Sequence, residues 1–74
     1  MANNKYIINV NSFEELTEPQ KMILSIKGAL EEIKANPDQE QFFGMFIGSV
    51  LQDLKEKYNI SKDEIFKYRF NINS

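Results

Sequence analysis

Two amphipathic segments on either side of Pro37 constrain the fold of this 74-residue chain more than any other feature. In both segments, apolar residues recur at three- and four-residue spacing, which is typical of one face of a helix. The first set is Met22, Ile23, Ile26, Ala29, Leu30 and Ile33, and the second is Phe43, Ile47, Val50, Leu51, Leu54 and Tyr58. Because the connection between them is short, the two segments predict an antiparallel helical hairpin.

Local signals mark the ends of the first predicted helix. Thr17 and Gln20 have the spacing of a capping box, which predicts a helix over about 18–35. Asn36 precedes Pro37, and a residue before proline is disfavoured in helical geometry. The helix is therefore expected to end just before this pair.

The second predicted helix has its own start and stop signals. Asp38 and Gln41 again have capping-box spacing, so we predict a helix over about 39–58. Asn59 is expected to end it, because asparagine tolerates the left-handed conformation found at helix C-termini.

Alternating segments lie on both sides of the hairpin. Residues 5–11 place Tyr6, Ile8 and Val10 on one face, which predicts a half-buried strand. Near the other end, residues 61–64 have a capping box that could open a short helix. The residues after it alternate between apolar and polar, so we predict a turn at 60–64 and a strand over about 65–72.

The resulting order of strand, helix, helix, strand predicts one α+β domain over residues 1–74. We expect the antiparallel hairpin to pack on a short antiparallel sheet, because two antiparallel helices return the chain in the opposite direction. A two-stranded sheet is marginal in water, and its open edges invite pairing with another chain. We therefore expect dimerisation to complete the fold.

Composition restricts the chemistry that is open to this chain. It has no cysteine and no histidine, so disulfides, thiol nucleophiles, the usual general base and the commonest zinc ligands are missing. The net charge of −2 does not indicate a strongly cationic surface for nucleic acid or membrane. We predict no enzyme activity, no cofactor and no metal site.

One side of the second predicted helix carries apolar residues outside its core face. Phe42, Met45 and Phe46 point away from the face that holds Phe43 and Ile47, so the first half of the helix is apolar nearly all round. Such a helix is normally buried on both sides. We predict a protein interface here, first of all a homodimer; the alternative is that another segment of the same chain covers these residues.

Two glycines lie in the same segment. Gly44 and Gly48 form a Gly-x-x-x-Gly pattern, and each costs about 0.5–1 kcal/mol relative to alanine inside a helix. Close approach of another backbone would offset this cost. That backbone could belong to a second copy or to the first helix of the same chain, near Gly28 or Ala29.

Basic and amide residues in the predicted strands support a second hypothesis, a small dimeric nucleic-acid-binding protein. The strand–helix–helix order of residues 5–58 is similar in topology to ribbon-helix-helix dimers, which place a two-stranded ribbon in the major groove. A single-strand-binding sheet is the other form, because aromatic residues alternate with cations near the C-terminus. The candidate contacts are Lys5, Asn9, Asn11, Lys67 and Arg69.

Our main functional prediction is a non-catalytic module that binds another protein stoichiometrically, as a small regulator, adaptor or inhibitor. The predicted interface is Phe42, Gly44, Met45, Phe46 and Gly48. No signal peptide or membrane segment is apparent, so we expect a cytoplasmic protein. Only one of the nine basic residues is arginine, which suits an AT-rich genome such as that of a low-GC bacterium, a plasmid or a phage.

Overall fold

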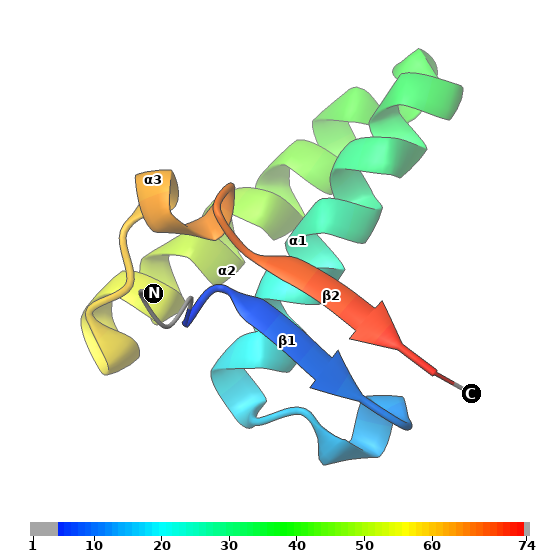
Figure 1. Cartoon of the computed structure of the whole chain (residues 1–74). Coiled ribbons are helices and arrows are strands. Elements are labelled where there is room, and N and C mark those ends of the chain that lie inside the picture. Colours follow the sequence, from blue (N-terminus) through cyan, green and yellow to red (C-terminus); the bar gives the residue numbers. More distant parts are fainter. Residues whose placement is uncertain (1–4, 74) are drawn as a thin grey trace.

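The computed structural model of the chain describes residues 5–73 and contains helices and one two-stranded sheet (Figure 1). In chain order, its elements are β1 (Ile7–Val10), a 3₁₀ turn (Phe13–Glu15), α1 (Glu18–Ala35), a second 3₁₀ turn (Pro37–Gln39), α2 (Glu40–Tyr58), α3 (Lys62–Ile65) and β2 (Arg69–Ile72). This mixture confirms the predicted α+β class.

The predicted capping box starts α1. The Gln20 backbone N–H donates to the Thr17 hydroxyl oxygen at 3.4 Å, and the Thr17 N–H donates to the Gln20 side-chain carbonyl at 2.9 Å. Each partner thus satisfies a backbone donor that the first turn of a helix leaves unpaired. The helix ends at Ala35, before the Asn36–Pro37 pair, as its sequence predicts.

The bounds of α2 agree with the prediction to within one residue, but its predicted N-terminal cap is wrong. Asp38 lies inside the second 3₁₀ turn, and the N-cap residue Gln39 makes no side-chain capping bond, so the predicted Asp38–Gln41 capping box is wrong. At the other end, Asn59 has the left-handed conformation, with φ of 56°. Its N–H donates to the carbonyl oxygens of Leu54 and Lys55, which closes the last turn.

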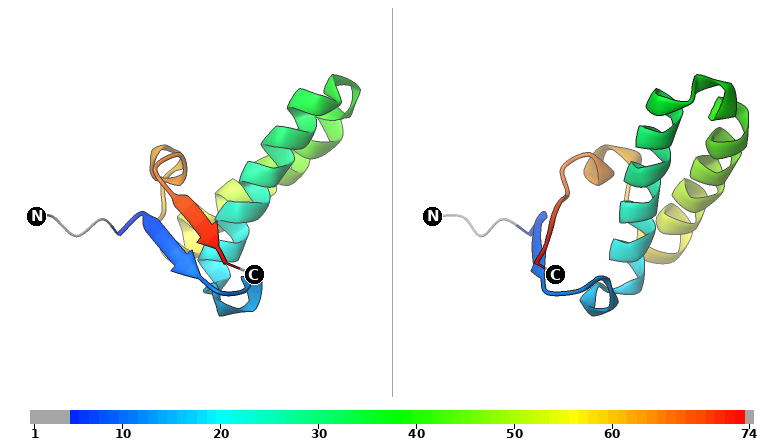
Figure 2. Two further views of the ribbon diagram at one scale, coloured as in Figure 1. Left: turned by 45° about the vertical axis from the view of Figure 1, so that its right-hand side comes forward. Right: turned by 90° about the vertical axis from the view of Figure 1, so that its right-hand side faces the viewer.

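The helices α1 and α2 lie side by side and run in opposite directions, forming the predicted hairpin (Figures 1 and 2). The sheet lies beside the lower half of this hairpin, near the start of α1 and the end of α2. The tip of the hairpin, where residues 36–40 connect the helices, projects beyond the sheet in Figure 1. The first half of α2 therefore lies away from both strands.

The sheet is parallel, so the predicted antiparallel sheet is wrong. Ile7 lies opposite Arg69, and Val10 lies opposite Ile72. The predicted second strand also began too early: part of the range 65–72 lies in α3 and in the turn after it, and only Arg69–Ile72 is extended.

The segment between α2 and β2 explains the parallel direction. Residues 59–68 carry the chain back to the start of β1, where the Arg69 N–H donates to the Tyr6 carbonyl oxygen at 2.8 Å. The Tyr6 hydroxyl donates to the Glu64 carboxylate at 3.3 Å. Since β2 begins beside the beginning of β1, the two strands run in the same direction.

The capping box at residues 61–64 does form, and it opens α3. The Glu64 N–H donates to the Ser61 hydroxyl oxygen, and the Ser61 N–H donates to the Glu64 carboxylate. Both interpretations of this segment were thus partly correct, because a short helix comes first and a strand follows.

The core joins the three helices. Its fully buried members are Ile23 and Ile26 of α1, Leu54 of α2 and Ile65 of α3, each 2 % exposed or less. Two half-buried side chains also pack against this cluster, namely Tyr68, which precedes β2, and Phe70 of β2. Within residues 5–73, no helix has the length and apolar character that crossing a membrane requires.

Candidate functional site

An apolar stripe on α2 is the clearest candidate for a binding surface. Its members are Phe42, Met45 and Phe46, which are 67 %, 73 % and 42 % exposed. We call this set the α2 stripe. The spacing places all three on one side of the helix, away from half-buried Phe43 and Ile47.

No described part of the chain covers the α2 stripe. The turn at residues 12–16 places Leu16 in a buried position near the start of α1, and the C-terminal residues form α3 and β2 beside the sheet end of the hairpin. The alternative that another segment of this chain shields the stripe is therefore wrong for residues 5–73. Phe42 contacts only its neighbour Phe43 among aromatic rings, edge to face at 5.2 Å between centroids.

The stretch of α2 that carries the stripe is uncharged. Residues 41–52 contain no lysine, arginine, aspartate or glutamate, although 27 % of the chain is charged. A second copy of this helix could therefore approach without repulsion between like charges.

Among residues 5–73, no other segment packs closely against the glycines of α2. A Cβ atom placed on Gly44, Gly48 or Gly28 would meet no atom within 4 Å. Of the two alternatives for Gly44 and Gly48, a close crossing by the first helix is therefore wrong. Their cost in helix stability is not offset by a backbone contact among residues 5–73.

This openness gives a direct prediction. Gly44→Ala and Gly48→Ala should each raise the free energy of unfolding of the monomer by about 0.5–1 kcal/mol, because alanine favours the helix and meets open space. Chemical denaturation at low protein concentration measures this change, and Gly28→Ala on α1 is the matched control. A decrease at Gly44 or Gly48, with an increase at Gly28, would reveal a close contact at α2 and contradict the prediction.

The five candidate nucleic-acid residues are all exposed and lie in or next to the two strands. Lys5 and Lys67 both lie over the Tyr6 ring, with their ammonium nitrogens 5.2 Å and 5.5 Å from its centroid. An acidic side chain adjoins this pair, because Glu64 accepts the Tyr6 hydroxyl hydrogen bond. The local charge is thus partly neutralised.

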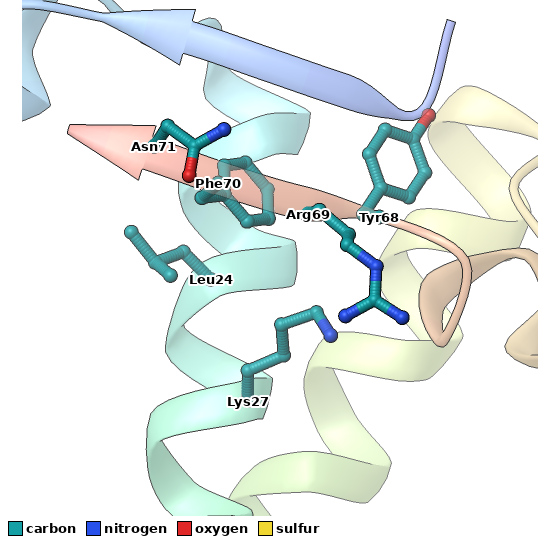
Figure 3. Close-up of a pocket in the computed structure, with 6 residues that line it drawn as sticks. All are labelled: Leu24, Lys27, Tyr68, Arg69, Phe70 and Asn71. Atoms are coloured by element: carbon teal, nitrogen blue, oxygen red, sulfur yellow. The ribbon is translucent and has the colours of Figure 1, made fainter. Parts of the chain in front are cut away.

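The other three candidates make different contacts, although strand alternation in the parallel register places exposed Asn9 and Arg69 on the same face of the sheet. Asn9 accepts a hydrogen bond from the side-chain amide of Asn71 at 2.9 Å, across the two strands. The backbone N–H of Asn11 donates to the Glu15 carboxylate at 3.2 Å. Arg69 instead reaches across the edge of β2 toward α1 (Figure 3).

A groove between β2 and α1 is the site that sequence reasoning missed. It has a volume of about 330 Å³ and is lined by Leu24 and Lys27 of α1 and by Tyr68, Arg69, Phe70 and Asn71 (Figure 3). The charged ends of Lys27 and Arg69 point toward each other in this view. No sequence signal could have predicted that Lys27 and Arg69 line one groove, because this depends on β2 lying beside α1.

A second hollow continues along α1 from the same lysine. It measures about 510 Å³ and is lined by Lys27, Leu30, Glu31, Lys34 and Phe66. Lys34 and Glu31 form the one ion pair among the described residues, at 3.5 Å, so Lys27 and Arg69 have no carboxylate partner there.

The aromatic residues of the sheet belong to the packed side. The rings of Tyr6 and Tyr68 meet edge to face at 5.0 Å, and Tyr68 stacks on Phe70 at 6.1 Å. Burial, assisted by the negative charge of Glu64, raises the pKa of Tyr68 above its usual value of 10.0. The Tyr68 phenol is therefore neutral at physiological pH. The three rings contribute to packing on the inner side of the sheet.

Comparison with known proteins found no relative of this chain. No protein-family model, curated protein sequence or solved structure matches this chain. Within residues 5–73, no three histidine, cysteine, aspartate or glutamate side chains are grouped so that they could hold a metal ion.

Proposed function

We propose that this protein is a non-catalytic interaction module that binds through the α2 stripe, as a small regulator, adaptor or inhibitor. The observation that carries the proposal is the exposure of Phe42, Met45 and Phe46 on one side of a single helix. Contiguous apolar surface of this kind marks interaction sites in folded proteins. A cytoplasmic location, and an origin in a bacterium, plasmid or phage, belong to the same proposal and rest on composition.

A second copy of the chain is the first expected occupant. The lack of charge over residues 41–52 permits two α2 helices to pack against each other through the stripe. If the chain is a monomer, the stripe instead fits the apolar groove of another protein, where anchors at i, i+3 and i+4 spacing are typical.

Nucleic-acid binding is the alternative, and the pair Lys5 and Lys67 supports it. Two observations weigh against it. β1 already pairs with β2 in the same chain, whereas a ribbon-helix-helix dimer pairs this strand with its counterpart in a second chain. Tyr68 and Phe70 pack against the core, so they are not free to stack on bases.

The test is light scattering after size exclusion over a wide range of concentrations. We expect the wild-type chain to be a dimer, and Phe46→Asp to raise the dissociation constant by more than about thirtyfold, because a buried interface would then contain a carboxylate. Circular dichroism should show that the variant stays folded, because Phe46 is not part of the buried core.

The matched control is Phe66→Asp, the same change at a position that is 58 % exposed and follows α3. It should leave dimerisation unchanged. Equal loss of association in both variants, or none in Phe46→Asp, would show that the stripe is not the interface. If the wild-type chain is a monomer, a second copy does not occupy the stripe. Binding of an apolar dye to the wild type, and not to Phe46→Asp, would then support an interface for another protein. Oligonucleotide binding that weakens steeply with salt would favour the alternative.

A further inference from the structure

The sheet has an open edge along β2. The N–H groups of Arg69 and Asn73 donate to the carbonyl oxygens of Tyr6 and Val10, at 2.8 Å and 2.9 Å. In a parallel ladder every second residue bonds to the neighbouring strand, so residues 69, 71 and 73 face β1. The backbone groups of Phe70 and Ile72 consequently point to the other edge, where no strand lies among residues 5–73.

The groove between β2 and α1 lies beside this open edge (Figure 3). Leu24 and Phe70 give it apolar lining, and the second hollow extends it along α1 through their shared residue Lys27. A chain that lay in this groove could therefore form main-chain hydrogen bonds to β2 and cover apolar surface of α1. A third strand would also strengthen a sheet that has only two.

Charge identifies the occupant. Lys27 and Arg69 point toward each other and have no carboxylate partner among the described residues. Two cations that line one groove repel each other, and a carboxylate placed between them would relieve this repulsion. A second copy that paired through its own β2 would bring another Lys27 and Arg69 to the same place, so charge disfavours it.

We propose that an extended, acidic peptide segment of a partner protein binds along β2 as a third strand. Its backbone would pair with Phe70 and Ile72, and a carboxylate side chain would lie between Lys27 and Arg69. This mode, in which main-chain bonds give affinity and alternate side chains give specificity, is β-augmentation. The site is separate from the α2 stripe, so neither proposal depends on the other.

The experiment uses a synthetic peptide of about eight residues that alternates valine and glutamate. Its binding to the full chain is followed by NMR through backbone amide shifts and hydrogen exchange. We expect shifts centred on β2 and on Lys27, slower exchange of the Phe70 and Ile72 amides, and affinity that falls as salt is added. A valine–lysine peptide of equal length should bind far more weakly.

Two variants at one position isolate the main-chain contribution. Ile72→Pro removes an N–H that faces the open edge and leaves every bond to β1 in place, so it should weaken the valine–glutamate peptide by at least about fivefold. Ile72→Ala removes the side chain and keeps this N–H, so it should bind the peptide nearly as well as the wild type. Joint reversal by Lys27→Glu and Arg69→Glu should shift the preference to the valine–lysine peptide.

Several results would overturn the proposal. They are a lack of shifts in β2 at saturating peptide, equal binding of the two peptides, or full binding by Ile72→Pro. Shifts in β2 that arise only with a DNA or RNA oligonucleotide would assign the groove to nucleic acid instead. Phe46→Asp should bind the peptide normally, so failure of the α2 stripe and failure of this groove are distinguishable.

Discussion

Leu54→Ala is expected to lower the free energy of unfolding by about 2–5 kcal/mol, which is a large part of the stability of a small domain. Leu54 is fully buried and lies in the cluster with Ile23, Ile26 and Ile65, where α1, α2 and α3 meet. Truncation leaves a cavity at the junction of three elements, and none of the rigid helices can collapse into it without moving the others. Urea denaturation followed by circular dichroism measures the loss.

Met45→Ala is the matched control, because Met45 lies on the same helix and is 73 % exposed. At concentrations where the chain is monomeric, this change should alter stability by no more than about 0.5 kcal/mol. Similar losses in the two variants would mean that α2 packs through a different face from the one described.

Ile65→Ala should release the C-terminal part of the fold more than the hairpin. A helix of four residues such as α3 has little stability of its own, so the buried Ile65 side chain and the Ser61–Glu64 capping box hold it in place. Loss of this anchor is expected to cost about 2–4 kcal/mol. Because α3 positions the start of β2, the amide of Arg69 should exchange at least about thirtyfold faster with solvent.

Native-state hydrogen exchange provides the measurement, and the adjacent Phe66→Ala provides the control. Phe66 is mostly exposed, so its truncation should leave the Arg69 amide protected. We expect amides in the middle of α1, such as that of Ile26, to lose less protection than Arg69 in Ile65→Ala. Equal losses at both positions would show that the whole chain opens as one unit.

The sequence was sufficient to predict the elements whose signals are local. The capping box of Thr17, the break at Pro37 and the left-handed Asn59 defined α1 and the end of α2. These signals act within a few residues and do not depend on the rest of the fold. The start of α2 was predicted to within one residue, but the capping box was wrong, because Asp38 lies inside the 3₁₀ turn that begins at Pro37.

The direction of β2 could not be predicted in this way. It depends on the path of residues 59–68, which combine a left-handed residue, a short helix and a turn. Each of these has a recognisable local signal, but their combined rotation of the chain is fixed by the burial of Ile65 and by the contact of Glu64 with Tyr6. Those are long-range contacts, and periodicity contains no information on them.

The two candidate sites also differ in whether local sequence signals could predict them. The position of Phe42, Met45 and Phe46 away from the core face follows from helical periodicity, so the sequence located the α2 stripe, whereas their exposure depends on the rest of the fold. The groove of Lys27 and Arg69 needs α1 and β2 to be neighbours, and the predicted antiparallel sheet did not specify this. Arg69 was predicted only as a possible nucleic-acid contact.

The pairing of β1 with β2 has a consequence for how the chain folds as it is synthesised. Asn9 and its partner Asn71 are 62 residues apart. At about 5–20 residues per second, the ribosome completes β2 roughly 3–12 s after β1. The hairpin of α1 and α2 relies on contacts closer in sequence, which form far faster than this interval. The helices would therefore assemble first and provide a surface against which β1 packs. β2 would complete the sheet last.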